Sequence, residues 1–405
     1  MKIALVSADL KQRMEYELRG NILPFWLAHA ADHEKGGFHG SISNDLVVDD
    51  SVERSLVLCA RMLWTYSAAY RFYRDPQYLE MARHAYAALT GPFLDKDFGG
   101  MYWRVDSDGA ATNTRKQTYG QAFAIYALAE YHRASGEEEP LRLAQELFRL
   151  IEDHAGDPLN GGYIEGCARD WSTLADMRLS DKEPFNCPKS MNTLLHILEG
   201  YTNLLRVWDH PHLRQQQVKL VEIFFARVIN PRTHLTRLFF ELDWQPLGDR
   251  FSFGHDIECS WLLVEAAEVL GDETLTARAR ETALQMADEV YQRGLDKDGS
   301  LFAEGGPEGV SDPFKHWWAH AEGVVGFFNA SEICAENDTP RQERYLNAAL
   351  RLWEYIEAEF IDHQHGEWFK VLDRIGTPLP GQPKAGPWED PYHQSRACME
   401  IIRRA

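Results

Sequence analysis

The sequence predicts an all-α fold, an (α/α)6 barrel in which six helical hairpins close into a ring. Three observations lead to this prediction. A glycine-centred phrase recurs every 62 to 69 residues, two helical stretches lie between successive phrases, and six such units account for all 405 residues. A closed ring leaves no exposed terminal repeat that must be capped. We therefore expect one domain over residues 1–405, with short β-hairpins at one rim.

The recurring phrase consists of an acidic residue, a glycine or glycine pair, and an aromatic residue that opens a short alternating segment. It occurs at 36–38, 99–102, 161–163, 299–302 and 366–368. The gap of 138 residues between the third and fourth copies is twice the period, so a degenerate copy is expected midway. The segment HLTRLFFELDWQPLG at 234–248 occupies that place.

Between the phrases, apolar residues recur at helical spacing. In 51–74 they are Leu56, Cys59, Leu63, Tyr66 and Tyr70, and the next stretch, 77–90, repeats the pattern. The same design predicts four further helix pairs: 116–135 with 139–154, 189–207 with 213–229, 256–270 with 274–293, and 317–334 with 340–359. Polar and aromatic residues interrupt the apolar faces of the expected inner helices.

One long irregular stretch, residues 376–391, holds five prolines and three glycines. Loops of this length in compact domains are usually functional or disordered. This stretch ends in a strong helix start, with Asp390 as the expected N-cap and Pro391 in the first helical position. We expect an ordered loop, the alternative being a solvated surface loop.

Composition excludes several classes of function. The 42 basic and 62 acidic residues give a net charge of −20, which disfavours nucleic acid and anionic membrane surfaces as partners. No apolar stretch approaches the roughly 18 residues of a membrane span, and the N-terminal apolar run is too short for a signal peptide. Six widely spaced cysteines are expected to be free thiols in a reducing cytoplasm.

The sequence contains no HExxH, Walker A, GxGxxG or GxSxG motif. The nearest metal-like spacing is His363–Gln364–His365, which lies in a glycine hairpin and lacks a third ligand on a rigid element. The missing motifs disfavour nucleotide, dinucleotide and serine-hydrolase functions, and we expect no zinc or iron at the His363–His365 pair.

Three of the sixteen histidines lie where they could carry chemistry. His255 and His393 each fall in the first turn of an expected helix, where the positive helix end disfavours the imidazolium form. Two neutral rings suit a two-base proton transfer. The third, His196, shares a helix face with Asn192 and Glu199. Each histidine taken alone is more often a satisfied core residue.

Cationic and aromatic residues accompany these histidines. Arg61 lies within an apolar helix, so it is either paired with a carboxylate or reserved for an anionic intermediate. Tyr119 supplies a hydroxyl. Trp317, Trp318 and Trp388 offer faces on which a sugar ring can stack, with core packing as the alternative.

Five blocks of sequence carry a resemblance to a known family. They are RMLWTYSAAYR at 61–71, DMRLSDKEPFNCPKSMNTLLHILEGYTNLLRVW at 176–208, GHDIECSWLL at 254–263, WWAHAEGVVGFFNA at 317–330 and GPWEDPYHQSR at 386–396. With them the sequence resembles the N-acylglucosamine 2-epimerase superfamily, and most closely its cellobiose 2-epimerase branch. The resemblance implies an (α/α)6 barrel without an organic cofactor or a catalytic metal.

The resemblance also implies roles for particular residues. His393 matches the base that removes the proton at carbon 2 of a sugar, and His255 matches the base on the opposite face. His196 matches the residue that assists ring opening. The remaining matches are Arg61 beside the enediolate oxygen, Glu258 orienting His255, Trp318 and Trp388 contacting the sugar, and Glu322 as a polar partner near them. Leu194 departs from the branch, which commonly has histidine there, and this puts the local polar network in question.

The function expected from the sequence is 2-epimerisation of the reducing-end aldose of a β-1,4-linked disaccharide, such as cellobiose or lactose. The alternatives are a mannose or glucose 2-epimerase, an aldose–ketose isomerase and an N-acylglucosamine 2-epimerase. A glycoside hydrolase on the same fold, which needs two carboxylates, and a non-catalytic helical scaffold are less favoured. The expected partner is a small sugar, and the protein is expected to be a monomer or homodimer.

Overall fold

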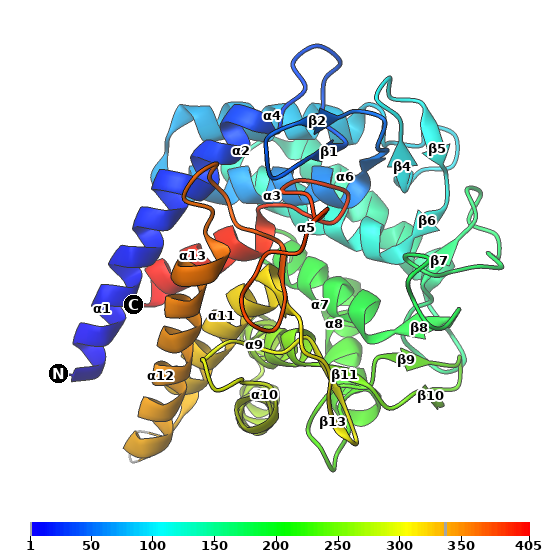
Figure 1. Cartoon of the computed structure of the whole chain (residues 1–405). Coiled ribbons are helices and arrows are strands. Elements are labelled where there is room, and N and C mark those ends of the chain that lie inside the picture. Colours follow the sequence, from blue (N-terminus) through cyan, green and yellow to red (C-terminus); the bar gives the residue numbers. More distant parts are fainter. Residues whose placement is uncertain (1, 336–337) are drawn as a thin grey trace.

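The computed structural model describes residues 2–335 and 338–405 and shows an (α/α)6 barrel (Figure 1). Within the described residues, six inner helices form the ring, and each contacts the next, with the last returning to the first. These inner helices are α3 (Leu56–Tyr73), α5 (Thr118–Ser135), α7 (Met191–Leu205), α9 (Phe253–Leu270), α11 (Trp317–Ile333) and α13 (Tyr392–Arg404). The predicted fold class is confirmed.

An outer helix packs against each inner one. Five of them follow their inner helix in the chain: α4 (Pro76–Thr90), α6 (Glu138–Leu150), α8 (Pro211–Ile223), α10 (Glu273–Arg293) and α12 (Thr339–Tyr355). The sixth pair joins distant segments, because α1 (Lys2–Glu17) packs against α13. Figure 1 shows this as a blue helix beside a red one. A π-helical turn, Leu18–Ile22, leads from α1 to α2 (Leu23–His29). Similar turns at Ile151–Ala155, Phe224–Val228 and Ile356–Phe360 extend α6, α8 and α12.

Short antiparallel strands lie at the rim where the inner helices begin. They form six small sheets: β1–β2, β3–β4–β5, β6–β7, β8–β9–β10, β11–β12–β13 and β14–β15. Their bounds are β1 Ser41–Ile42, β2 Val48–Asp49, β3 Arg54–Ser55, β4 Arg104–Val105, β5 Ala111–Asn113, β6 Lys116–Gln117, β7 Gly166–Cys167, β8 Lys189–Ser190, β9 Phe239–Phe240, β10 Pro246–Leu247, β11 Phe251–Ser252, β12 Glu304–Gly306, β13 Gly309–Asp312, β14 Lys315–His316 and β15 Val371–Leu372. The rim hairpins predicted from the glycine phrases are therefore present.

The glycine phrases form tight turns that a buried ion pair ties to the next inner helix. In the second unit, Gly99 and Gly100 have φ values of 71° and 73°, which a residue with a Cβ rarely adopts. The preceding Asp95 accepts hydrogen bonds from turn N–H groups and from Lys116 Nζ at 2.9 Å. Equivalent pairs recur in four other units: Asp32–Arg54, Asp157–Lys189, Asp296–Lys315 and Asp362–Lys384.

The degenerate unit has lost both partners of this ion pair. Asn230 stands in its turn where the other units have aspartate, and Phe251 stands in β11 where they have lysine or arginine. Its turn still closes, because Asn230 N–H donates to Leu235 C=O and His234 takes a positive φ of 51°. A neutral turn beside an apolar residue leaves no buried charge unpaired.

In three units, a second recurring contact joins the rim hairpin to the fourth residue of an inner helix. Gln121 and Asp256 accept a hydrogen bond from the backbone N–H of Met101 and Thr236, each at 2.7 Å. His320 accepts one from Leu301 N–H at 3.0 Å. In α7 the fourth residue is Leu194, which is fully buried and carries no acceptor.

In this unit the hairpin residue equivalent to Met101, Thr236 and Leu301 is Tyr163. Among the contacts of the described residues, its backbone N–H makes no hydrogen bond. With leucine at 194, α7 therefore lacks this contact with its hairpin, and the residue lies outside the lining of the inner cavity described below.

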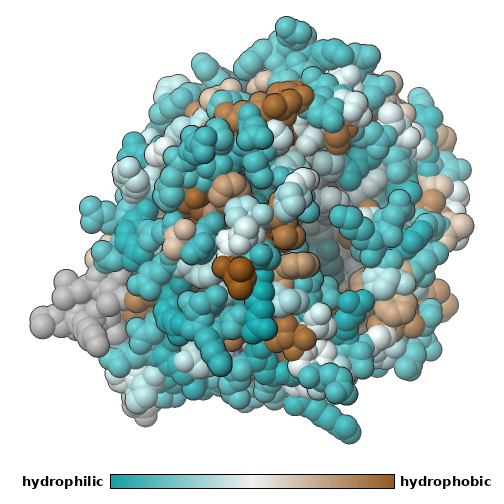
Figure 2. Space-filling model, in the orientation of Figure 1, coloured by the Kyte–Doolittle hydropathy of each residue, from teal (hydrophilic) through white to brown (hydrophobic). Residues whose placement is uncertain are grey.

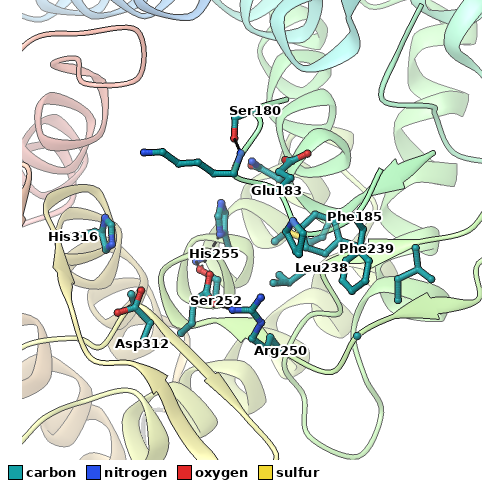
Figure 3. Close-up of a pocket in the computed structure, with 18 of the residues that line it drawn as sticks. Ser180, Glu183, Phe185, Leu238, Phe239, Arg250, Ser252, His255, Asp312 and His316 are labelled. Carbon is teal, nitrogen blue, oxygen red and sulfur yellow. Dashed lines mark hydrogen bonds and ion pairs between the residues drawn. The ribbon is translucent and has the colours of Figure 1, made fainter. Parts of the chain in front are cut away.

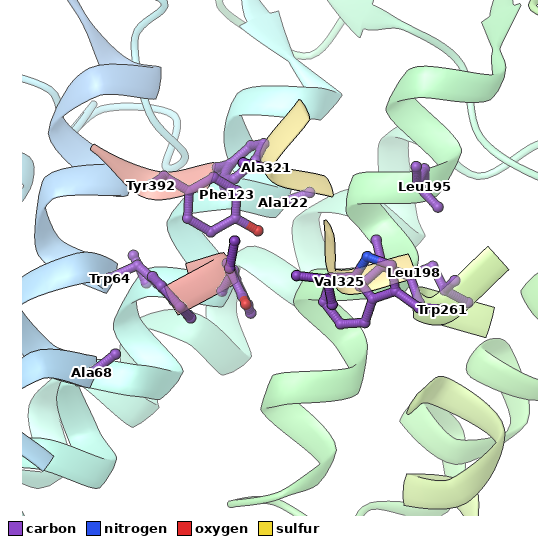
Figure 4. Close-up of a cluster of buried hydrophobic side chains, with 14 of the residues drawn as sticks. Trp64, Ala68, Ala122, Phe123, Leu195, Leu198, Trp261, Ala321, Val325 and Tyr392 are labelled. Carbon is purple, nitrogen blue, oxygen red and sulfur yellow. The ribbon is translucent and has the colours of Figure 1, made fainter. Parts of the chain in front are cut away.

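Aromatic and aliphatic side chains from the inner helices fill the axis of the barrel (Figure 4). Trp64 stacks on Tyr126 with ring centroids 5.2 Å apart, and Tyr392 meets both rings edge-on. Trp261, Leu198 and Val325 lie on the other side of the view. This packing gives the polar residues at the inner helix starts a rigid floor.

The proline-rich stretch 376–391 is ordered, as expected. Leu372 bridges Pro378, and Ala385 bridges Ile42, so the stretch lies against the rim. The predicted helix start is one residue early, because α13 begins at Tyr392 and Pro391 is its N-cap residue. Asp390 still accepts a hydrogen bond from Tyr392 N–H at 2.9 Å.

The surface and the cysteines also agree with the composition. The face seen in Figure 2 is mostly hydrophilic, with hydrophobic residues scattered over it. Cys59, Cys167, Cys187, Cys259, Cys334 and Cys398 are all buried free thiols. In the part of the chain that the structure describes, no helix has the length and apolar character needed to cross a membrane.

Candidate active site

A cavity of about 170 Å³ lies at the N-terminal ends of the inner helices, and we call it the inner cavity. Residues from all six inner helices and from the 376–391 loop line it: Arg61, Tyr119, Asn192, His196, His255, Glu258, Trp317, Trp318, Trp388 and His393. All ten are among the eleven site residues predicted from the sequence. The eleventh, Glu322, is fully buried and contacts His393.

His393 is held by Glu322. Its Nδ1 lies 2.7 Å from Glu322 Oε1. A carboxylate at this distance accepts the Nδ1 proton, which fixes the tautomer and leaves Nε2 with its lone pair for the cavity. The same carboxylate stabilises the imidazolium that forms when Nε2 takes a proton.

His196 is held in the same way by Glu199, one turn along α7. The distance from Nδ1 to Glu199 Oε2 is 2.9 Å, and both side chains are buried. The ring packs edge-on against Tyr119, with centroids 4.9 Å apart. The i,i+3 spacing of His196 and Glu199, noted in the sequence, therefore corresponds to a direct contact.

His255 has a different partner from the one expected. Its Nδ1 lies 2.9 Å from Ser252 Oγ, the hydroxyl that also caps α9. Glu258, expected to orient His255, instead accepts a hydrogen bond from Arg396 at 2.7 Å. The i,i+3 spacing puts Glu258 on the right face of α9, but the guanidinium on α13 attracts its carboxyl group away from the ring.

Arg396 is the main residue of the site that the sequence reasoning missed. Its guanidinium, 2 % exposed, contacts Glu199 and bonds Glu258 and Glu322 at 2.7 Å and 2.5 Å. One cation thus anchors the carboxylates that hold His196 and His393. The signal available was its position three residues after His393 in α13, on the same helix face.

Arg61 is paired with a carboxylate, the first of the two alternatives left open. Its guanidinium donates to Asp390 at 2.7 Å and to Tyr119 Oη at 2.9 Å. The pair is buried and joins α3 to the end of the proline-rich loop. It places a fixed positive group in the wall of the inner cavity.

The tryptophans divide into two roles. Trp318 packs close to both candidate bases, with its ring 4.6 Å from that of His255 and 5.6 Å from that of His393. Trp388 packs edge-on against Tyr119 at 5.7 Å. Trp317 is 6 % exposed and lies under Lys370 Nζ, so it is mostly a packing residue.

Burial keeps the three histidines neutral. Loss of solvation lowers the pKa of His255 to about 3, and the neighbouring His196 and Arg61 add to that shift. Burial also lowers the pKa of His393 well below its ordinary value, assisted by Arg61 and Arg396. For His196, burial lowers the pKa although Glu199 opposes the shift. These shifts favour the neutral form expected from the sequence, but burial rather than the helix end is their first cause.

A larger cavity of about 520 Å³ adjoins the inner one, and we call it the outer cavity. The two share Asn192, His255 and Trp318. In Figure 3, His255 lies between His316 on one side and Phe185 and Phe239 on the other. Charged and polar side chains complete the wall, among them Ser180, Glu183, Arg250 and Asp312.

Among the residues that the structure describes, two groups of side chains have metal-like spacing, Asp32 with His39 and Asp50, and Glu258 with Glu322 and His393. In the first group, Asp32 is paired with Arg54. The second already holds the Arg396 guanidinium between its carboxylates. Neither group offers a free set of ligands, and the His363–Gln364–His365 segment is in neither.

Histidines around one cavity, a fixed guanidinium and aromatic rings are groups that can move a proton and bind a sugar. On an (α/α)6 barrel, this combination fits a carbohydrate epimerase, which is an enzyme of the isomerase class.

Comparison with known proteins gives the family. The family model for N-acylglucosamine 2-epimerase matches residues 36–397, and the chain belongs to that family. It is 42 % identical to a cellobiose 2-epimerase of Bacteroides fragilis over 97 % of this chain and 98 % of the relative. A solved cellobiose 2-epimerase from Bacillus thermoamylovorans superposes with a TM-score of 0.92 at 35 % identity, covering 98 % of this chain and all of that one. A solved D-mannose isomerase gives 0.82 at 22 % identity, with 97 % and 98 % covered.

Proposed function

We propose that this enzyme is a 2-epimerase of β-1,4-linked disaccharides, which converts the reducing-end glucose unit of cellobiose to mannose and lactose to epilactose. The observation that carries the proposal is the pair His393 and His255, which line one inner cavity with their Nδ1 atoms engaged and the Trp318 ring close to both. The names of the relatives over nearly the full chain support the same reaction.

The first half of the proposed reaction is removal of a proton. The sugar ring opens to the aldehyde, with His196 and Glu199 as the acid–base pair for that step, and the carbonyl acidifies the hydrogen on carbon 2. His393 Nε2 takes this proton, and Glu322 stabilises the imidazolium that results. Negative charge develops on the enediolate oxygens, where the fixed guanidinium of Arg61 lowers its energy.

The second half returns a proton on the other face. Rotation about the bond between carbon 2 and carbon 3 exposes that face to His255, which donates a proton from Nε2. His255 can act as this acid only after it has taken a proton from water and become an imidazolium ion. A forward turnover thus begins with the imidazolium at His255 and ends with the imidazolium at His393, so the sugar keeps its formula. The two rings then exchange protons with water before the next forward turn. If the proton goes to carbon 1, the product is a ketose.

The outer cavity supports a disaccharide rather than a monosaccharide substrate. It is about three times the volume of the inner cavity, and its wall adjoins His255 and Trp318. A reducing-end unit in the inner cavity would extend its 4-linked neighbour into this space. Polar groups such as Ser180, Arg250 and Asp312 can bind the hydroxyls of that neighbour.

The proposal is tested by incubating the enzyme in deuterated water with cellobiose, lactose, mannose or N-acetylglucosamine. We expect deuterium at carbon 2 of an epimer and the highest kcat/KM with a disaccharide. His255→Ala and His393→Ala should abolish incorporation while the fold is retained. His363→Ala, an exposed histidine at the rim, is the matched control and should keep full activity. Incorporation with no aldose, or full activity in either active-site variant, would refute the proposal.

The same incubation separates the alternatives. A dominant ketose product would identify an aldose–ketose isomerase, and a preference for N-acetylglucosamine would identify an N-acylglucosamine 2-epimerase. The hydrolase alternative needs two carboxyl groups that act as an acid and a base or nucleophile. Glu322 does not fit either role, since its carboxyl group already accepts hydrogen bonds from His393, Arg396 and Trp261.

A further inference from the structure

The two carboxyl oxygens of Glu258 have unequal surroundings. Oε1 accepts a hydrogen bond from Arg396 at 2.7 Å. Oε2 is buried and has no hydrogen-bond partner among the described residues. Because Glu258 lines the inner cavity, Oε2 is the oxygen left available to a molecule bound there.

Glu322, the neighbouring carboxyl group, is fully supplied with donors. It accepts from His393 Nδ1 at 2.7 Å, from Arg396 at 2.5 Å and from Trp261 Nε1 at 3.0 Å. The same guanidinium nitrogen, Nη2 of Arg396, serves both Glu322 and Glu258. Oxygens of the two carboxyl groups lie within 4.8 Å of each other. Two like charges at this distance in a buried site rarely ionise together.

The charges around Glu258 do not balance if every carboxyl group is ionised. Glu199 on α7, Glu258 on α9 and Glu322 on α11 share the single cation Arg396 of α13. The other nearby cation, Arg61 of α3, is neutralised by Asp390. Burial lowers the pKa of each histidine that faces the group, His196, His255 and His393, so these rings supply little compensating positive charge. One proton on a carboxyl group relieves part of the uncompensated charge.

Of the three carboxyl groups, Glu258 has the fewest donors, so it is the one that keeps this proton. Burial and the negative charge of Glu322 raise its pKa well above the ordinary value. Glu199, by contrast, has its pKa lowered, since Arg396 and the His196 contact outweigh its burial.

We propose that Glu258 is held as a neutral carboxylic acid whose Oε2–H donates a hydrogen bond to a sugar oxygen in the inner cavity. This inference rests on the proposed sugar chemistry for the identity of the acceptor, but the protonation state stands independently of it. The donor stabilises the enediolate oxygen as charge develops there. Glu258 is thus a substrate-contacting residue rather than a group that orients His255.

The protonation state is tested on the full-length enzyme without substrate. Infrared difference spectra of wild type and Glu258→Gln at neutral pH should show the carbonyl stretch of a protonated carboxyl group that the variant lacks. Glu165→Gln, which alters another buried carboxyl group, is the control and should remove a different band. Absence of a band specific to Glu258 would overturn the inference, even if the enzyme proves to be an active epimerase.

The donor role is tested by kinetics on cellobiose. Glutamine keeps a neutral group that can accept from Arg396 and donate into the cavity, so Glu258→Gln should lower kcat/KM by less than about tenfold. Glu258→Ala removes the donor and should lower kcat/KM by about 100-fold. Glu322→Gln removes the carboxylate that holds His393 and should lower kcat/KM by at least as much as Glu258→Ala does. Equal losses in Glu258→Gln and Glu258→Ala, with folding confirmed by circular dichroism, would overturn the donor role.

Discussion

Replacing Leu194 by histidine should change the stability of the barrel and leave its substrate preference unaltered. Leu194 occupies the fourth position of α7, where Gln121, Asp256 and His320 of the other units accept a hairpin N–H. A histidine there would accept from Tyr163 N–H, as His320 does from Leu301. Because Leu194 does not line the inner cavity, the sugar contacts remain as they are.

The magnitude follows from the two groups involved. A buried N–H without a partner costs about 1–3 kcal/mol, and a hydrogen bond that satisfies it recovers about 1 kcal/mol net. Loss of leucine packing offsets part of this gain, so Leu194→His should raise the free energy of unfolding by at most about 1–2 kcal/mol. The reverse change, His320→Leu, removes an acceptor that Leu301 N–H now uses and should lower it by about 1–3 kcal/mol.

Chemical denaturation measures both free energies, and amide hydrogen exchange reports the local effect directly. Tyr163 N–H should exchange faster than Leu301 N–H in the parent enzyme and slow down in Leu194→His. The ratio of kcat/KM for cellobiose to that for mannose should stay within about twofold. A tenfold shift of that ratio would show that residue 194 acts on the substrate. Unchanged exchange at Tyr163 would show that a histidine at 194 does not accept its N–H. Either result would refute the reasoning from the repeat.

Three further predictions concern the site and the core. Glu322→Gln should lower kcat by at least about 100-fold with KM little changed, because His393 loses the group that stabilises its imidazolium, and steady-state kinetics would contradict this if only KM rose. Burial raises the pKa of Glu165 to about 8, so between about pH 5 and about pH 8 the folded protein binds more protons than the unfolded one. Stability should therefore fall as pH rises through that range, and the thermal midpoint of Glu165→Gln should depend less on pH. An equal pH dependence in both proteins would show that the carboxyl group titrates normally. Gly162 has a φ of 77°, and a Cβ added there would lie 2.7 Å from a Trp244 ring atom. Gly162→Ala should therefore lower the free energy of unfolding in denaturant by about 1–3 kcal/mol. The loss should exceed that of Gly136→Ala, where nothing lies within 4 Å of the new Cβ, and equal losses would argue against a clash.

The fold was predictable because its signals are local. In each unit glycines mark the turn, and apolar residues at helical spacing mark the helices. The degenerate copy at 234–248 lies where the period requires it. The helix pair of the sixth unit could not be predicted, because nothing in the sequence indicates that α1 packs against α13. The helix start at Tyr392 differed from the expected one by one residue, as helix boundaries often do.

The candidate site was predictable as a set of residues but not as a network of contacts. The sequence places His196 beside Glu199, a contact within one helix turn. It does not show that Arg396 reaches Glu258 and Glu199, 138 and 197 residues away, or that Arg61 meets Asp390 across 329 residues. Those contacts depend on how the helices face one another around the ring.

The meeting of α3 with α13 gives the ring a seam, across which Arg61 and Asp390 bind. Every other junction of the ring joins inner helices that are consecutive in the chain. This one closes a loop of more than 300 residues, and closing it costs chain entropy. Contacts of such long range form late in folding and are the first to be lost in partial opening. Because His393 lies on one side of the seam and Arg61 on the other, an opened ring would keep most of its helices and lose its chemistry, so activity should report the integrity of the seam before any spectroscopic measure of helix content does.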